Sequence, residues 1–446
     1  EGDVMPRYLL LFGDASFDFK DRVENNTNFI PTFESENSLH YINSYATDDY
    51  FGFLDEDEGD DNSDLLDIGI GRFVVSTPEE ARRAVDKVLH YAKSSSSLGD
   101  WRNVITFVGD DEDGNVHMNQ AEQLATFVDT TYPYYNVDKI YIDAYTQEST
   151  PGGQRYPAVN EAINSRIEKG TLIMNYTGHG GEVGWAHERI LEISDINDWA
   201  NFDRLSVFVT ATCEFTRYDD PTRVSAGEYV FMNPDGGGIS LFTTARATFG
   251  GSNLSLNRGF YKYAFEKENG EHYAMGDLIR LAKLESTSST NDKKFVLIGD
   301  PALKIAYPTY RVVTTNINQS GSNAESDTIR ALSKVTIEGM VVDGAGDMVT
   351  DFNGHLKSIV FDKESVVTTL GQDESSSQRT FLVRKNTIYN GLSSVSDGEF
   401  AFSFIVPKDI AYNFGRGKVS YYAENGEEDA SGYNMEIVIG GYNDDT

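Results

Sequence analysis

One thiol and one imidazole occupy corresponding places after two apolar segments of this chain of 446 residues. Cys213, the only cysteine, directly follows the apolar run 205–212, and His179 follows the apolar run 171–176. Both runs predict buried strands, and ligands of open α/β sheets bind beyond the carboxyl ends of the strands. A thiolate attacks acyl carbon, and an imidazole accepts and returns the proton. The two residues therefore predict a cysteine hydrolase or acyl transferase.

The residues around this pair allow a second interpretation. His179 stands between Gly178 and Gly180, so the backbone can approach a substrate closely, and the N–H groups of Gly180 and Cys213 could face a developing oxyanion. However, free cysteine is among the most buried residue types and often only fills a core. A histidine between glycines is also common in turns. The residues alone leave catalysis and packing as alternatives.

Composition excludes several classes of protein. The net charge is −34, from 71 acidic and 37 basic residues, which argues against a nucleic-acid partner. This charge fits an extracytoplasmic protein, a protein that holds divalent cations, or acidity that serves solubility alone. A lone cysteine excludes an internal disulfide framework and a multi-cysteine zinc site. No apolar stretch is long enough for a transmembrane helix, and the first residues do not resemble a signal peptide. Whether further residues precede the chain stays open.

The sequence pattern predicts two α/β subdomains, whose strands and helices must position Cys213 and His179. Residues 1–97 predict strands at 8–12 and 66–75, a helix that Ser76 caps with Glu79 in a capping box, and a short serine connector. Residues 98–307 alternate strands and helices, which predicts a mostly parallel sheet covered on both faces. The expected strands are 104–108, 171–176, 205–212, 238–244 and 295–298, and the expected helices 118–130, 157–168, 225–232, 256–267 and 275–285.

After residue 307 the hydrophobic period changes. Residues 308–446 contain strand-like runs at 328–332, 334–342 and 400–406, separated by Asx-Gly turn signals. No convincing helix appears there. This segment predicts an all-β domain of the sandwich type, with 321–326 as a loop inside it.

Two segments carry a family resemblance. Asn175–Trp185 contains the His-Gly-Gly sequence, and Thr210–Phe215 contains Ala-Thr-Cys; together they resemble the gingipain-type cysteine peptidases, family C25 of clan CD. Gly71–Phe73 and Ile298–Leu303 fit the same pattern, so the resemblance covers residues 8–307. It implies a caspase-like fold of two parallel-sheet α/β subdomains, followed by an Ig-like β domain.

The resemblance also implies roles for single residues. Cys213 would be the nucleophile, His179 the general acid/base, and the N–H groups of Gly180 and Cys213 the oxyanion hole. An acidic residue just after a strand would orient the histidine, and here that is Asp111, with Asp110 as the alternative. A solvated or calcium-binding loop explains the same acidic run equally well.

A substrate pocket is implied beside these residues. The arginine-specific gingipains carry an aspartate where this chain has His117, and a neutral imidazole does not select arginine as a carboxylate does. Glu182 and Trp185 are expected to border the pocket. The alternatives are that His117 lies on the surface at a helix start and that Trp185 belongs to the core.

Three further segments, 44–55, 113–122 and 217–221, resemble a subfamily of cell-surface sortases that serve the type IX secretion system of Bacteroidetes. That resemblance implies an enzyme at the outer membrane of a Gram-negative bacterium, with other secretion components as partners. It would remove the C-terminal signal domain of secreted cargo and transfer the cargo, through a thioester, to an amine of anionic lipopolysaccharide. A plain endopeptidase and a non-catalytic adhesion or scaffold module are the alternatives.

Acidic loops suggest a structural metal. Asp55, Asp57 and Asp60 in one loop and Asp110 and Asp113 in another supply the oxygen ligands that Ca²⁺ prefers. Neither loop has EF-hand spacing, and solvated acidic loops explain both. Gingipain-like relatives bind calcium, so a structural Ca²⁺ is expected, whereas the chemistry itself requires no cofactor.

Overall fold

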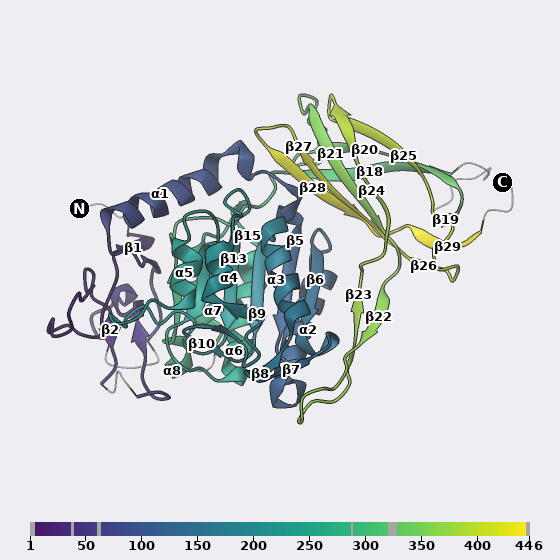
Figure 1. The fold of residues 1–446 in the computed structure, drawn as a ribbon. Helices are drawn as coiled ribbons and strands as arrows, with labels where there is room; N and C mark the ends of the chain where they lie inside the picture. The colour runs from purple at the N-terminus through teal and green to yellow at the C-terminus, as the bar shows by residue number, and fades with distance from the viewer. Residues whose placement is uncertain (1–4, 37–39, 60–63, 287–288, 320–327, 443–446) are drawn as a thin grey trace.

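A computed structural model describes residues 5–36, 40–59, 64–286, 289–319 and 328–442. Figure 1 shows two bodies: an α/β body that contains the predicted catalytic residues, and an all-β module that begins at β18 (Tyr310–Gln319). None of the described helices is both long and apolar enough to cross a membrane.

One sheet of eight strands runs through the α/β body. Its order is β1-β4-β17-β14-β13-β9-β5-β6. Neighbours pair in parallel except β14 and β17, which are antiparallel. The strands are β1 (Tyr8–Phe12), β4 (Gly69–Phe73), β5 (Val104–Gly109), β6 (Asn136–Tyr141), β9 (Ile173–Thr177), β13 (Ser206–Ala211), β14 (Gly238–Thr244) and β17 (Phe295–Ile298). The carboxyl ends of β5, β9 and β13 therefore meet at one edge.

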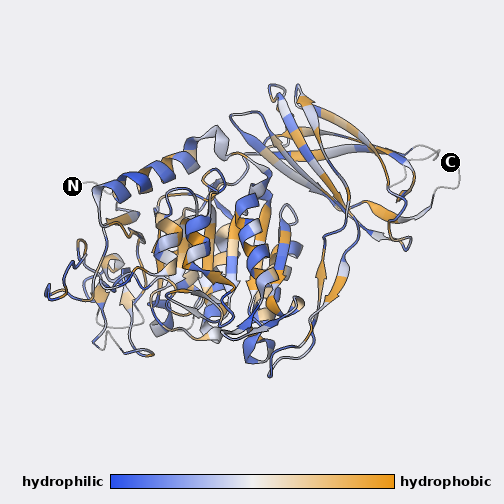
Figure 2. Ribbon diagram, viewed as in Figure 1, coloured by the Kyte–Doolittle hydropathy of each residue, from blue (hydrophilic) through white to orange (hydrophobic). Residues whose placement is uncertain are grey.

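Helices cover both faces of this sheet. The helices are α1 (Pro78–Lys93), α2 (Glu112–Thr131), α3 (Pro157–Lys169), α4 (Ile193–Asp198), α5 (Ala226–Met232), α6 (Gly250–Ala264), α7 (Met275–Leu284) and α8 (Ser289–Asp292). One apolar core joins α2, α6 and α7 to one face, and a second joins α1, α3, α4 and α5 to the other. Figure 2 shows the apolar strands between these two layers of helices. The sheet is buried on both sides, as the continuous apolar runs of its strands require.

Short elements complete the α/β body. Short strands pair as β2 (Phe33–Glu34) with β3 (Ala46–Thr47), β7 (Glu148–Thr150) with β8 (Gly153–Arg155), and β15 (Lys267–Glu268) with β16 (Glu271–His272). β10 (Gly180–Gly181), β11 (Gly184–Trp185) and β12 (Leu191–Glu192) form a small sheet directly after β9. Single turns of 3-10 helix span Asp49–Gly52, Ser95–Ser97, Asp100–Asn103 and Ile142–Ala144.

The all-β module is a closed barrel of seven strands, in the order β18-β20-β25-β24-β21-β27-β28. A small sheet of β19, β29 and β26 and a long hairpin of β22 and β23 extend from it (Figure 1). The strands are β19 (Thr328–Ala331), β20 (Lys334–Val342), β21 (Gly354–Phe361), β22 (Ser365–Thr368), β23 (Thr380–Val383), β24 (Thr387–Ser396), β25 (Glu399–Ile405), β26 (Gly415–Arg416), β27 (Lys418–Glu424), β28 (Asp429–Asn434) and β29 (Val438–Tyr442).

Polar contacts fix the barrel to the α/β body. The Arg102 guanidinium lies 2.9 Å from the Asp429 carboxylate, and both side chains are buried. At the far end, the turn of the β22–β23 hairpin reaches the start of α2: the Ser377 N–H donates to Asn115 Oδ1 over 2.9 Å, and the Ser376 hydroxyl donates to the Asp111 carbonyl. The all-β module therefore touches the loop that follows β5.

Most predicted elements are present, with three differences. The strands of residues 1–97 and 98–307 join in one sheet, so no boundary near residue 97 separates two sheets. The capping box of α1 uses Thr77 and Glu80 instead of Ser76 and Glu79. The expected sandwich closes into a barrel, because β28 also pairs with β18. The expected loop at 321–326 lies outside the described residues.

Candidate active site

The pairing of β9 with β13 brings the predicted nucleophile and acid/base to one edge of the sheet. Thr177 is paired with Ala211 in parallel register, and the Gly178 N–H continues the pairing by donating to the Ala211 carbonyl over 3.3 Å. His179 and Cys213 each lie two positions beyond the paired residues. Because neighbouring strands are about 4.8 Å apart, both residues begin from adjacent points of the same edge.

Cys213 is only partly buried, so its thiol is not sealed in the core. The Thr248 N–H points to Sγ over 3.5 Å. The ammonium of the buried residue Lys294 donates to the Ala247 carbonyl over 2.7 Å. Burial lowers the pKa of Lys294, and the Cys213 thiolate opposes this shift. A cation and an N–H donor therefore lie near the sulfur. No pattern in the sequence distinguishes Lys294 from other lysines, and its role emerges only from the fold.

Three hydrogen bonds hold the backbone of His179. Its N–H donates to Asp110 Oδ2 over 2.7 Å, and its carbonyl accepts the Tyr176 hydroxyl at 2.5 Å and the Ala186 N–H at 2.8 Å. Asp110 is fully buried and also accepts the Asp111 N–H. Asp110 thus positions the histidine through its backbone, not through its imidazole.

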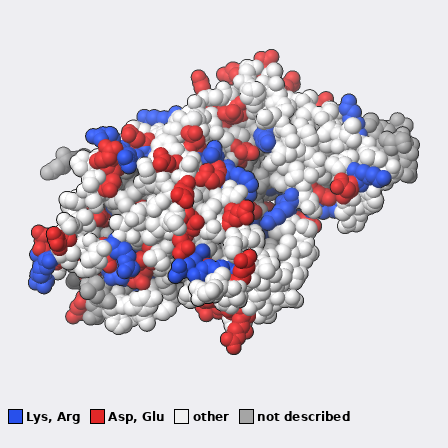
Figure 3. Space-filling view, viewed as in Figure 1, with Lys and Arg blue, Asp and Glu red and all other residues white. Residues whose placement is uncertain are grey.

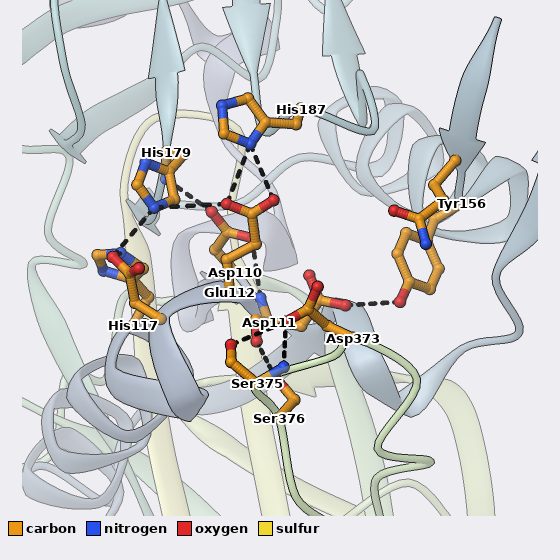
Figure 4. A network of polar contacts seen from close by, with 12 residues as sticks. Asp110, Asp111, Glu112, His117, Tyr156, His179, His187, Asp373, Ser375 and Ser376 are labelled. Carbon is orange, nitrogen blue, oxygen red and sulfur yellow. Dashed lines mark hydrogen bonds and ion pairs between the residues drawn. The ribbon is translucent and has the colours of Figure 1, made fainter.

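The imidazole of His179 faces two other carboxylates (Figure 4). Its Nε2 lies 3.1 Å from Asp113 Oδ2 and 3.5 Å from Glu112 Oε2. Residues 113–115 have φ values of 54°, 66° and 68°, which belong to the left-handed region. This turn interrupts α2 near its start, next to the two carboxylates.

The prediction that Asp111 orients the imidazole is wrong. Its Oδ2 accepts the hydroxyl of Tyr156 over 2.5 Å, inside the protein. Asp110, Asp111 and Glu188 form a buried cluster whose carboxylate oxygens lie within 4.8 Å of one another. Burial raises the pKa of these groups to about 6, about 7 and about 6, respectively. At about pH 5–6 the cluster therefore holds protons that exposed carboxylates would already have released.

Two more histidines lie beside His179. The ring of His117 is 5.0 Å away at 85°, and the ring of His187 is 5.2 Å away and nearly parallel. His117 is buried, which lowers its pKa, so the structure does not place it on the surface. Glu112 accepts from His187 Nδ1 over 2.8 Å, and this hydrogen bond raises the pKa of His187. The sequence reading missed His187 and Glu112.

The other pocket residues have structural partners. Trp185 is completely buried and stacks on Tyr176 with 4.3 Å between ring centroids, so it belongs to the core and does not border a pocket. Glu182 pairs with Arg217 at 3.0 Å and Arg223 at 2.7 Å, which ties the turn between β10 and β11 to the segment after Cys213.

The predicted oxyanion donors are compatible with the geometry. The Cys213 N–H donates to no group in the described part of the chain. A Cβ at Gly180 would lie 2.6 Å from Thr212 Oγ1 and 2.9 Å from the Gly184 carbonyl. Only glycine fits there, so β10 passes close to the residue that precedes the thiol.

The structure divides the predicted calcium ligands. Carboxylate oxygens of Asp55, Glu58 and Asp67 lie within 4.8 Å of one another on the surface, a donor set suited to a hard cation. Asp57 is not part of that group, and Asp60 lies outside the described residues. Asp110 groups with Asp111 and Glu188, and Asp113 groups with His117 and His179, so the two predicted ligands belong to different clusters.

The chain is similar to known peptidases along most of its length. The sequence profile of Peptidase family C25 matches residues 1–306. Lys-gingipain of Porphyromonas gingivalis is 27% identical over 151 residues, which are 34% of this chain and 8% of that protein. Gingipain R2 of the same species is 25% identical over 129 residues, 28% of this chain and 16% of that protein. This chain thus spans a small part of these relatives.

The solved structure of gingipain R shows the same fold. The Arg-specific cysteine proteinase gingipain R aligns over 96% of this chain and 84% of that chain, with 16% identity and a TM-score of 0.53. Dimeric latent PorU from Porphyromonas gingivalis aligns over 100% of this chain and 37% of that chain, with 26% identity and a TM-score of 0.38. By the match over residues 1–306, this chain belongs to peptidase family C25.

Proposed function

We propose that this protein is a cysteine peptidase of the gingipain type, with Cys213 as nucleophile and His179 as general acid/base. The observation that carries the proposal is the parallel register of β9 and β13, which delivers both side chains to one edge of the sheet. The partial exposure of Cys213 and the hydrogen bonds that fix the His179 backbone support it. A core cysteine would need none of these features.

The chemistry begins with attack of the Cys213 thiolate on the carbonyl carbon of a peptide bond, which forms a C–S bond. The N–H groups of Cys213 and Gly180 stabilise the oxyanion. Two carboxylates at His179 Nε2 favour a proton on that nitrogen and leave Nδ1 to exchange a proton with the reactants. The imidazole protonates the leaving amine, the C–N bond breaks, and a thioester remains.

The finer proposal concerns the group that releases the thioester. We propose that an amine replaces water, so that the protein acts as a sortase at the bacterial cell surface. It would remove the C-terminal signal domain of type IX cargo and pass the cargo to anionic lipopolysaccharide. The segments 44–55, 113–122 and 217–221 support this choice, as does His117 at the place of the arginine-selecting aspartate. A structural Ca²⁺ at Asp55, Glu58 and Asp67 belongs to the same proposal.

Labelling of Cys213 tests the peptidase proposal. A peptidyl electrophile should modify Cys213 at a rate that rises with pH and falls at least tenfold in His179→Ala, because the base is lost. The matched control is His355→Ala, an exposed histidine of the barrel. A labelling rate that depends neither on pH nor on either substitution would favour a non-catalytic scaffold module.

Product analysis tests the finer proposal. Cargo that carries its signal domain is incubated with increasing concentrations of an amine. A sortase yields increasing amide product, because amine and water compete for one thioester. If only hydrolysed product forms at every amine concentration, the sortase proposal is wrong and the protein is a plain endopeptidase.

A further inference from the structure

Three imidazoles and two carboxylates converge beside the edge of the sheet that holds Cys213 (Figure 4). His117, His179 and Asp113 offer ligand atoms that all lie within 4.8 Å of one another, and Glu112, His179 and His187 form a second such group. His179 belongs to both groups. Imidazole nitrogens with carboxylate oxygens are the donors that Zn²⁺ and similar transition metals prefer, whereas Ca²⁺ prefers oxygen alone.

The environment of His117 is a second, independent indication that a ligand binds here. It is 8% exposed, and neither of its ring nitrogens makes a hydrogen bond within the described residues. Its Nε2 lies 3.3 Å from Asp113 Oδ2. Buried polar atoms without hydrogen-bond partners are rare. The Nε2 atom of His117 is such an atom, and it faces the carboxylate of Asp113.

The spacing of the donor atoms fits a tetrahedral ion. Ligands about 2.0–2.1 Å from a tetrahedral Zn²⁺ lie about 3.3 Å from one another. The corresponding separations are 3.1 Å for His179 Nε2 to Asp113 and 3.3 Å for His117 Nε2 to Asp113. We propose that His117, His179 and Asp113 bind a divalent transition metal of the Zn²⁺ class.

Binding of this metal would switch off the base. A metal on Nε2 of His179 displaces the proton from that nitrogen, and the neutral ring then carries its proton on Nδ1. Nδ1 can no longer accept a proton from the reactants. The side chain of Asp113 is 61% exposed, so the metal can enter and leave from solvent. This consequence rests on the proposed function, but the binding itself does not.

Titration with Co²⁺, which gives visible absorption in tetrahedral sites, tests the binding directly. We expect one equivalent to bind and Zn²⁺ to displace it. His117→Gln should weaken the affinity at least tenfold, because loss even of a residue that supports a metal ligand costs 10–100-fold. Asp113→Asn should do the same, and its residue lies on the surface, so folding is preserved. The controls His355→Gln and Asp409→Asn, both exposed in the all-β module, should bind as the natural protein does.

Cys213→Ala separates this site from the common alternative of a metal held by the thiol. Unchanged affinity in Cys213→Ala and no thiolate-to-cobalt absorption band support the proposal. Loss of binding in Cys213→Ala, or full affinity in both His117→Gln and Asp113→Asn, overturns it. Failure of Cys213 to react with electrophiles in metal-free protein would contradict the proposed function while leaving the metal site intact.

Discussion

Replacement of Asp111 by asparagine should stabilise the protein at neutral pH. The pKa of Asp111 is raised to about 7, chiefly by burial and also by Asp110 nearby. An unfolded chain releases this proton near pH 4, so between pH 4 and pH 7 the folded state binds more protons than the unfolded state. The free energy of unfolding therefore falls as pH rises through this range, and stays low above it.

The magnitude follows from the shift. About three pKa units correspond to about 4 kcal/mol, at 1.36 kcal/mol per unit. Asp110 and Glu188 share protons with Asp111, so the fraction assigned to one group is smaller, and we expect ~2–4 kcal/mol at pH 7.5. Asparagine keeps an oxygen that can accept the Tyr156 hydroxyl, and it never ionises.

Urea unfolding at pH 4 and at pH 7.5 measures this effect. Asp111→Asn should exceed the natural protein in stability at pH 7.5, and the two should differ by less than about 1 kcal/mol at pH 4. The exposed Asp409→Asn serves as control and should show neither effect. A variant that is destabilised equally at both pH values would refute the reasoning, because its asparagine would then simply be a poor fit.

Three other substitutions test the contacts around the site and the barrel. Lys294→Met should slow the alkylation of Cys213 at neutral pH by up to about tenfold, because it removes the cation that interacts with the sulfur; an unchanged rate would show that Lys294 serves only its contact with the Ala247 carbonyl. Gly180→Ala should lower the rate of thioester formation by about 100-fold with an unchanged far-UV spectrum, because its Cβ would meet Thr212 at 2.6 Å; normal kinetics would show that β10 has room to shift. Asp429→Asn should cost about 3–5 kcal/mol in urea unfolding, because it leaves the buried guanidinium of Arg102 unpaired; the exposed Glu436→Gln, with an unburied arginine partner, is its control and should cost less than 1 kcal/mol.

The sequence predicted the parts of the site that depend on strand periodicity. Long apolar runs end just before His179 and Cys213, and strands with such runs place their last residues at a sheet edge. Periodicity could not show that β1, β4 and β17 would join the same sheet in the opposite direction, because pairing between distant strands leaves no local pattern.

The acidic loop shows what local patterns cannot predict. Asp110, Asp111, Glu112 and Asp113 are chemically alike in sequence, but their partners in the structure differ, and residues 113–115 form a left-handed turn. Two of the carboxylates lie inside the protein and two lie beside the imidazole. The prediction that Trp185 borders a pocket failed for a similar reason. Its stacking on Tyr176 depends on how β11 folds back over β9, which the local sequence does not show.

Acidic and basic side chains both occur on the face shown in Figure 3, including the region between the two bodies. The hairpin of β22 and β23 crosses from one body to the other, and its turn binds the loop beside His179. The stability of the loop is therefore thermodynamically linked to the barrel. The α/β body and the all-β module form one functional unit, in which the smaller module contributes order to an active site on the larger one.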